Sequence, residues 1–310
     1  MGDDAIVSIG DNAGNDARGP PPKHVKLPRQ SDSNKRKIKQ TYTRDTLALS
    51  EGQPVENVVI LDADNYPKKR YFRTRAHCNP LSNNDGFKYP LGPEHVLWGL
   101  HYPRISEQDR TVRIVDVGMG FGGLTVALAR LFPEQLVLGM EIRAKLCEYV
   151  RLKIDALRLE HKGQYENAAC LRTNCMRYLP NFFRKGQLHK LFFCFPDPHF
   201  KTKNHRRRIV STILLSEYAY FLAPGARLYT VTDVEELHLW HVDKCSAHPC
   251  FRRLPNEELL QTDPAVQAML EETEESKKVA RMGGSKHFAV FERVRDDELP
   301  HVPSAWMDLF

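Results

Sequence analysis

The stretch from Arg113 to Glu141 constrains the fold of this chain more strongly than any other. It begins with a short β-branched apolar run, RIVDVG, that leads into a cluster of glycines. Apolar residues then recur at the i, i+3, i+4, i+7 spacing of one helix face, and Pro133 ends that pattern. A second apolar run, LVLGME, ends at Glu141. The pattern predicts a strand, a glycine turn, a helix and a second strand with an acid at its end.

The glycine turn indicates a site where a ligand approaches the backbone. Gly118, Gly120, Gly122 and Gly123 allow a sharp turn without Cβ atoms in the way. An acid about 20 residues downstream suits the two hydroxyls of a ribose, and the glycine spacing also matches a dinucleotide site. Asp116 favours S-adenosylmethionine (SAM), which has no pyrophosphate and needs acids for an amino group and a ribose. A glycine turn that binds no ligand is the alternative.

Length and charge limit the classes of protein to consider. The 310 residues can hold one large α/β domain with extensions, or two small domains. The net charge of +6 favours a polyanionic partner, either nucleic acid or a membrane surface. Since no apolar run approaches the ~20 residues that cross a bilayer, we expect no membrane span. The first ten residues, MGDDAIVSIG, lack the basic and hydrophobic regions of a signal peptide.

The cysteines favour a reducing compartment. There are seven, scattered without a C-x-x-C pair, as expected for free thiols in the cytosol or nucleus. His241, Cys245, His248 and Cys250 lie close enough in sequence to be considered as zinc ligands. Their spacing matches no common structural zinc pattern, so we expect no metal there.

The chain before the glycine turn divides into two parts. Residues 1–50 are rich in Gly, Asp, Asn, Pro, Lys and Ser, which predicts a disordered tail. The basic run at 35–39, KRKIK, fits a nuclear import signal, a nucleic-acid arm or a solvated tail, and we expect a nuclear protein. Residues 51–111 form an extension in which KKRYFRTR places Arg73 and Arg75 beside aromatic rings. That combination suits RNA, because guanidinium groups meet phosphates and rings stack on bases.

The region from 112 to 295 is predicted to be the core domain, followed by a tail at 296–310. Further strands are predicted at 169–172, 191–195 and 227–232, helices at 146–157 and 207–222, and a late antiparallel pair at 250–254 and 287–294. Strands that alternate with helices predict an α/β fold with a doubly wound, mostly parallel sheet. Such sheets bind ligands at the carboxyl ends of their strands.

The segment from Phe192 to Arg208, FFCFPDPHFKTKNHRRR, is the most informative about chemistry. A buried strand leads to Asp197 at the ligand edge, and a proline on either side fixes the backbone around this carboxylate. Basic residues follow with no acid among them. A fixed acid beside a basic patch suits a site that reads a base edge while the patch holds phosphates. We therefore predict RNA contacts from Lys201, Lys203, Arg206 and Arg207; the alternative is a rigid turn followed by a solvated helix start.

At this point the residues match a known family. In chain order, DVGMGFGG, LGMEIR, LRTNCMRYLPNFF, FPDPHFKTKNHRRR, YTVTD and TEESKKV closely resemble the tRNA (guanine-N7)-methyltransferases. The resemblance covers residues 68–294, and RYFRTRAHCNP resembles the eukaryotic catalytic subunit. It implies the class I SAM-dependent methyltransferase fold, of Rossmann-like type, and SAM as the cofactor. It also implies methyl transfer to guanine N7 at position 46, in the tRNA variable loop, and a non-catalytic WD-repeat partner.

The resemblance also implies roles for individual residues. Asp197 corresponds to the catalytic acid, and the residues that correspond to the SAM pocket are Gly118, Glu141, Arg143, Asn174, Cys175, Cys194, Thr273 and Glu275. Four positions depart from the usual pattern: Met119 for cysteine, Cys194 for leucine, Ser276 for glycine and Cys78 for serine. Ser276 weakens the assignment of the last two pocket residues, for which a solvated acidic helix face is the alternative.

Other functions remain open from the sequence. A methyltransferase for another amino or base substrate would share the cofactor site, and its Pro-rich turn loosely matches Pro-Asp-Pro. A non-catalytic RNA-binding subunit with a decayed pocket is the second alternative, although Glu141, Asp197 and Glu275 argue against decay. A hydride-transferring enzyme that uses NAD is the most distant.

Overall fold

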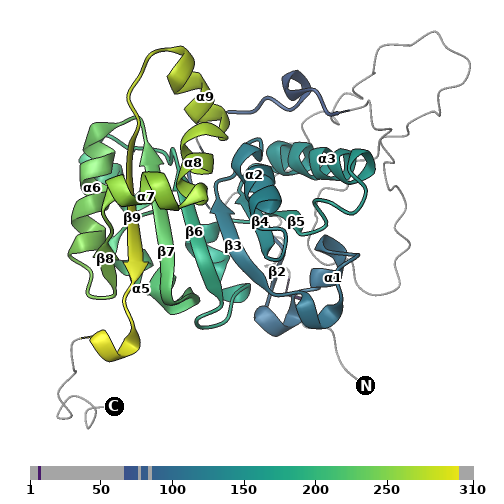
Figure 1. The fold of residues 1–310 in the computed structure, drawn as a ribbon, viewed down its shortest axis with the longest axis horizontal. Coiled ribbons are helices and arrows are strands. Elements are labelled where there is room, and N and C mark those ends of the chain that lie inside the picture. The colour runs from purple at the N-terminus through teal and green to yellow at the C-terminus, as the bar shows by residue number, and fades with distance from the viewer. Residues whose placement is uncertain (1–5, 8–65, 76–77, 83–85, 300–310) are drawn as a thin grey trace, which may run out of the picture.

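The computed structural model describes residues 6–7, 66–75, 78–82 and 86–299, and a seven-stranded sheet lies at its centre (Figure 1). The strand order is β5-β4-β3-β6-β7-β9-β8. The strands are β3 (Val112–Val117), β4 (Leu136–Glu141), β5 (Ala168–Arg172), β6 (Leu188–Cys194), β7 (Leu222–Thr232), β8 (Phe251–Arg253) and β9 (His287–Arg293). The first five run parallel, while β9 is antiparallel to both β7 and β8. The predicted doubly wound, mostly parallel sheet and its late antiparallel pair are confirmed. A separate two-stranded ribbon joins β1 (Ile6–Val7) to β2 (Tyr89–Pro90).

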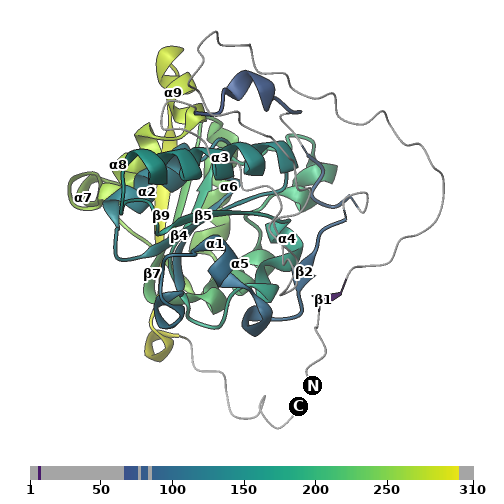
Figure 2. The same cartoon turned by 90° about the vertical axis from the view of Figure 1, so that its right-hand side faces the viewer.

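Helices cover both faces of the sheet, as Figure 2 shows. One face carries α2 (Gly123–Leu131), α3 (Ala144–Glu160), α7 (Asn256–Thr262) and α8 (Pro264–Glu271); the other carries α1 (Trp98–His101), α4 (Cys175–Tyr178), α5 (Thr212–Phe221) and α6 (Glu235–Ser246). A last helix, α9 (Glu274–Arg281), lies above the carboxyl ends of the parallel strands (Figure 1). No helix in the described part of the chain is both long and apolar enough to cross a membrane.

The sheet is buried on both sides, which explains its apolar strands. Side chains alternate between the two faces, so Leu191 and Phe193 pack with the α5 side while Phe192 packs with the α2 side. The same alternation directs Asp116 of β3 away from its neighbours Val115 and Val117. The core therefore consists of two apolar layers that meet only through the sheet.

The helix predicted at 207–222 is wrong at its start but ends at Phe221, close to the predicted end, while the strand predicted at 227–232 is wrong at its start. A short 3-10 turn, Thr202–Arg207, comes first, and α5 begins only after Ser211, whose hydroxyl accepts a hydrogen bond from the Leu214 N–H (3.5 Å). At the other end β7 begins directly at Leu222, and Pro224 and Gly225 bulge out where the register with β6 shifts. Apolar periodicity continued through both regions and so concealed these boundaries.

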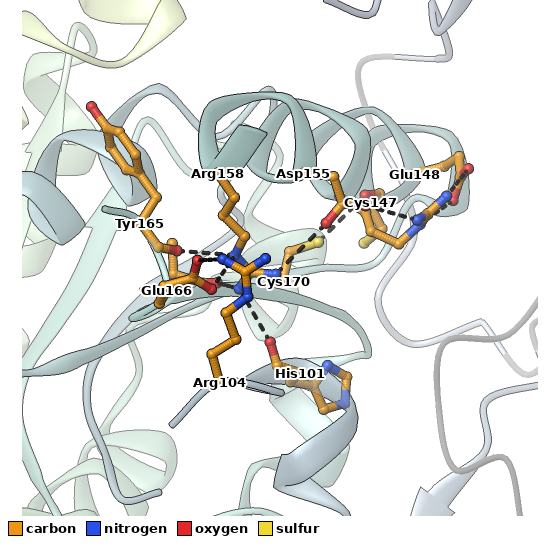
Figure 3. Close-up of polar contacts among 11 residues, drawn as sticks. His101, Arg104, Cys147, Glu148, Asp155, Arg158, Tyr165, Glu166 and Cys170 are labelled. Atoms are coloured by element: carbon orange, nitrogen blue, oxygen red, sulfur yellow. Dashed lines mark hydrogen bonds and ion pairs between the residues drawn. The ribbon is translucent and has the colours of Figure 1, made fainter. Parts of the chain in front are cut away.

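A polar cluster at the carboxyl end of α3 connects the extension before β3 to the sheet (Figure 3). Arg158 donates hydrogen bonds to the carbonyl oxygens of Ala168 (2.7 Å) and His101 (3.4 Å), and its Nε lies 3.5 Å from the Glu166 carboxylate. Arg104 donates to the same carboxylate (2.7 Å). The residues before β3 thus pack against the edge of the sheet at β5. The predicted division into domains remains a prediction, and the run at 35–39 and most of both predicted tails lie outside the described residues.

Candidate active site

A cavity of about 540 Å³ opens at the carboxyl ends of β3, β4, β5, β6 and β7. The predicted cofactor residues all line it: Gly118, Glu141, Arg143, Asn174, Cys175, Cys194, Thr273 and Glu275. Asp197 and Arg207 line the same cavity. The chain thus brings together residues that lie far apart in sequence, although their contacts with a cofactor and substrate remain a prediction.

Two glycines of the turn act in different ways. Gly118 adopts φ +76°, and a Cβ there would meet no atom within 4 Å, so its backbone faces open space. A Cβ on Gly123 would instead lie 2.1 Å from the Glu272 carbonyl oxygen. Gly123 therefore permits the close packing of α2 against the α8–α9 junction. That packing brings Thr273 and Glu275 to the cavity.

The Glu141 carboxylate is buried and fully hydrogen-bonded. It accepts from the backbone N–H groups of Gly120 (3.2 Å) and Arg143 (3.1 Å), and from Arg143 Nε (3.0 Å) and Nη2 (2.8 Å). These contacts use the lone pairs of both carboxylate oxygens. A ribose that binds Glu141 must therefore share it with Arg143 or displace the guanidinium group.

Asp116 places a second acid in the wall of the cavity. Burial raises the pKa of its carboxyl group to about 7. The negative charges of Glu274 and Glu141 also raise this pKa, whereas a hydrogen bond from Thr125 lowers it. The Thr125 hydroxyl donates that bond to Asp116 Oδ2 (2.7 Å). A carboxyl group that titrates near neutral pH, beside a cavity, is suited to a cationic ligand group.

The thiols of the cavity form an apolar wall. Cys175 and Cys194 both line it, and burial raises the pKa of each thiol well above its ordinary value. Both side chains are therefore neutral and pack as small hydrophobic groups. Met119 packs on Gly139, where a Cβ would lie 2.2 Å from its Sδ atom. The departures at Met119 and Cys194 are accommodated by this packing.

The loop that carries Asp197 has an unusual backbone. Phe195 and His199 adopt positive φ angles of 49° and 46°, which are strained for residues other than glycine. Between them, Pro196 and Pro198 have no N–H to donate, so neighbouring groups must hold the loop in other ways. The Phe195 N–H donates to the Val231 carbonyl oxygen of β7 (2.7 Å). The Asp197 side chain is half-buried at the rim of the cavity.

The predicted RNA-binding residues fall into three groups. Lys201, Lys203 and Arg206 are exposed beside the cavity, whereas Arg207 is half-buried and lines it. Arg73 and Arg75 are exposed in the extension and do not line the cavity.

The residues at the start of α9 are partly structural. The Thr273 hydroxyl accepts from the Ser276 N–H (2.9 Å) and caps the helix, and the buried Ser276 hydroxyl donates to the Met269 carbonyl oxygen (3.2 Å). Ser276 therefore fits this position without disturbing the helix start. Glu275 is exposed and pairs with Lys278 (3.0 Å), while its neighbour Glu274 faces the cavity more deeply.

Comparison with known proteins gives a consistent result. A family model described as "Putative methyltransferase" matches residues 110–289. The tRNA (guanine-N7)-methyltransferase of Anopheles gambiae is 52% identical over 228 residues, which cover 74% of this chain and 95% of that protein. The Schizosaccharomyces pombe enzyme of the same name is also 52% identical, over 235 residues that cover 74% of this chain and 85% of that protein. This chain belongs to the tRNA (guanine-N7)-methyltransferase family. Among solved structures, the aminoglycoside resistance methyltransferase NpmB1 aligns with 21% identity and a TM-score of 0.41, covering 67% of this chain and 96% of that one.

The cavity of this methyltransferase fits SAM, the cofactor of the family. Gly118 leaves room for a ligand against the backbone, Glu141 can bind a ribose that shares it with Arg143 or displaces the guanidinium group, and Asp116 is available to a cationic group. The neutral thiols of Cys175 and Cys194 suit the apolar parts of the molecule. Both of the acids that the sequence suggested for SAM lie in the same cavity.

Substitution of Glu141 should weaken SAM binding by the methyltransferase. We expect Glu141→Ala to cost ~1–3 kcal/mol, because ribose hydroxyls lose their charged partner and Arg143 loses its own. Calorimetric titration with SAM measures the loss. Glu148→Ala is the control, since Glu148 pairs with Arg151 (2.8 Å) and does not line the cavity. Unchanged affinity in folded Glu141→Ala would show that the ribose lies elsewhere.

SAM binding by the methyltransferase should also depend on pH through Asp116. In the free protein the raised pKa means that the folded state keeps the Asp116 proton at pH values where the unfolded state has lost it. The contribution of Asp116 to the free energy of unfolding is therefore fully present below about pH 4 and is lost as the pH rises to about 7. A cationic ligand favours the ionised form, so binding below about pH 7 should release a proton and affinity should rise with pH. Calorimetry in two buffers of different ionisation enthalpy detects that release. Asp116→Asn should abolish it; persistence of the buffer dependence in this variant would assign the proton to another group.

Some contacts around the methyltransferase cavity had no signal in the sequence. Asn174 donates from Nδ2 to the Pro80 carbonyl oxygen (2.6 Å), and Cys78 and Pro80 of the extension line the cavity. Lys69 pairs with Glu274 (2.8 Å) and connects the extension to α9. The partners lie 94 and 205 residues apart in sequence, and local patterns cannot reveal such contacts. Lys69 lies in the basic run that suggested RNA, yet it pairs within the protein.

His248, one of the possible zinc ligands, has other hydrogen-bond partners in this methyltransferase. His248 Nδ1 accepts from the Cys250 N–H (3.3 Å), and its Nε2 shares a hydrogen bond with Ser216 Oγ (3.1 Å). His241 and Cys245 are buried in α6. Within the described ranges, no group of three or more His, Cys, Asp or Glu side chains is arranged to hold a metal ion.

Proposed function

We propose that this chain transfers the methyl group of SAM to N7 of guanosine 46 in the variable loop of tRNA. The observation that carries the proposal is Asp197, held on a strained loop at the rim of a cavity that fits SAM. The names of the relatives support guanine N7 as the acceptor, and the resemblance to the family supports position 46. The exposed cations at Lys201, Lys203 and Arg206 lie on the path that the RNA backbone takes to the cavity.

Methyl transfer to guanine N7 requires no proton transfer by the protein before the nucleophile attacks. SAM supplies an electrophilic methyl group on a sulfonium sulfur. Guanine N7 already carries a lone pair, so the nucleophile needs no general base. The residues must instead align the base with the cofactor and exclude competing orientations, which can account for much of a rate enhancement. N7 is a major-groove acceptor, so the base has to leave its stack before it reaches the cavity.

Asp197 orients the base and stabilises its developing charge. Its carboxylate accepts a hydrogen bond from the N1–H or amino group of guanine and fixes the angle at which N7 enters. As the purine becomes positive, the same carboxylate lowers the energy of the transition state. Arg207, half-buried at the cavity, holds a phosphate close to the target nucleotide.

Nucleoside mass spectrometry tests the proposed reaction. Purified protein, SAM and an unmodified tRNA transcript should yield N7-methylguanosine, and a transcript with adenosine at position 46 should yield none. Methylation of a different atom would point to another base substrate. Methylation of the adenosine transcript at a second guanosine would contradict the position.

We further propose a WD-repeat protein as the non-catalytic partner of this chain in a heterodimer. Support comes from the resemblance of RYFRTRAHCNP to the eukaryotic catalytic subunit. Co-expression with such a partner should raise tRNA methylation well above that of the chain alone, measured at equal concentrations of catalytic chain. Full activity of the isolated chain, with a monomeric or homodimeric mass by light scattering, would contradict the heterodimer.

We also propose that the protein acts in the nucleus. The basic run at 35–39 supports this location. A fluorescent fusion should accumulate in nuclei, and replacement of the four basic residues of this run by alanine should redistribute it. A uniformly cytoplasmic fusion would contradict the proposal.

A further inference from the structure

The last arginine of the basic run behaves differently from its neighbours. Arg208 is 1% exposed, although Lys201, Lys203 and Arg206 face solvent. A buried guanidinium group is costly unless its hydrogen bonds are made inside the protein. The contacts of Arg208 therefore indicate its role in the structure.

Arg208 connects the loop of Asp197 to α6. Its Nε donates to the Pro198 carbonyl oxygen (2.8 Å), and its Nη2 donates to Glu236 Oε1 (2.6 Å). The guanidinium plane lies over the Trp240 ring, 4.6 Å from the centroid. Trp240 is itself held by its Nε1, which donates to the Val210 carbonyl oxygen (2.8 Å).

These contacts complete the support of a strained loop. Positive φ angles at Phe195 and His199 are strained for residues other than glycine, and they persist only where the surroundings hold them. β7 holds the loop on one side of Asp197, through the Phe195 N–H, and Arg208 holds it on the other, through the Pro198 carbonyl. Because proline has no N–H, the carbonyl is the only backbone group through which Pro198 can be held by a hydrogen bond, and Arg208 donates to it.

We propose that Arg208 is a positioning residue that holds the Asp197 carboxylate at the angle required for methyl transfer. This inference rests on the proposed function of Asp197. It assigns to Arg208 a role within the protein, unlike the RNA contacts assigned to its exposed neighbours. Arg208 does not line the cavity, so its effect is exerted through the loop and not by contact with the base or the cofactor.

Arg208→Lys tests the proposal because it keeps the charge but loses the planar group that donates to two acceptors at fixed angles. In the full chain, single-turnover methylation at saturating SAM and tRNA should fall ~10-fold or more, since small displacements of aligned groups are costly. SAM and tRNA affinities should stay within about twofold. Arg227→Lys is the matched control: Arg227 pairs with Asp263 (2.7 Å) outside the cavity, and its rate should not change.

A double-mutant cycle separates positioning from a general loss of stability. If Arg208 acts through Asp197, Arg208→Lys should have almost no further effect on the rate in an Asp197→Asn background. The proposal would be overturned if the fold-losses in rate of the two single variants multiplied in the double variant, or if Arg208→Lys had the wild-type rate.

Hydrogen exchange gives a readout that needs no catalysis. The Phe195 amide, which donates to the Val231 carbonyl oxygen (2.7 Å), should exchange faster in Arg208→Lys, with unchanged exchange in β3 and β4 as the internal reference. Unchanged exchange in the loop overturns the proposal whatever the activity. If wild-type protein makes no N7-methylguanosine, the proposed function fails, while the exchange experiment still decides the role of Arg208.

Should Arg208→Lys not fold, Glu236→Gln replaces it. Glu236 is 56% exposed, so its substitution is tolerable, and the amide keeps an acceptor while removing the charge that pairs with Arg208. The exchange of the loop should rise and the rate should fall, in the same direction as for Arg208→Lys. No change in either quantity would overturn the proposal.

Discussion

Asp197→Asn should lower the single-turnover rate of tRNA methylation by ~10²-fold or more. This is the scale of loss when one preorganised electrostatic contact to a transition state is removed. The amide keeps the size and one acceptor oxygen, but loses the negative charge that opposes the positive charge growing on guanine. The two flanking prolines and the anchor at Phe195 do not depend on the carboxylate, so the fold should hold.

The measurement is a single-turnover time course at saturating tRNA and SAM, because a loss of affinity alone would disappear there. Calorimetric SAM affinity should remain near that of the wild type. Asp243→Asn is the control: Asp243 is an exposed carboxylate on α6 that pairs with Lys244 and does not line the cavity. A near wild-type rate in folded Asp197→Asn would mean that Asp197 belongs only to a rigid turn.

Removal of the basic run should weaken tRNA binding and change its dependence on salt. When Lys201, Lys203, Arg206 and Arg207 are replaced together by alanine, the slope of log affinity against log salt should decrease by about 1 for each phosphate that is no longer neutralised. Binding isotherms at several salt concentrations measure the slope. SAM affinity should stay near normal for a variant of the three exposed residues alone.

The different positions of the four basic residues allow their effects on tRNA affinity and on the methylation rate to be separated. Replacing Lys201, Lys203 and Arg206 should lower affinity without changing the single-turnover rate at saturation, whereas Arg207→Ala should also lower the rate, because Arg207 lines the cavity. Lys162, Arg184 and Lys185 provide a control of equal charge: they are exposed and lie outside the cavity. Equal losses in this control triple would assign the effect to net charge, and unchanged binding in the quadruple variant would show that the run only contacts solvent.

Much of the fold could be predicted because its strongest signals are local. An apolar run of β-branched residues, a glycine turn and a 3.6-residue periodicity each depend on neighbouring residues, and they led correctly to β3, α2 and β4. Parallel strands also align their carboxyl ends, so Glu141 and Asp197 could be expected at one edge before any contact was known. The starts of α5 and β7 were predicted wrongly because the apolar pattern continues where the backbone changes conformation.

Local patterns in the sequence were sufficient to predict the sheet and the edge at which the cavity lies, and they suggested candidate residues that line this cavity. The contacts of each of those residues could be seen only in the folded chain. Folding paired Glu141 with Arg143, brought Pro80 against Asn174, and turned Arg208 inward while its neighbours face solvent. The difference arises from how far apart in sequence the interacting residues lie. Backbone conformation and periodicity follow from adjacent residues, whereas burial and side-chain pairing depend on elements that meet only after the chain has folded.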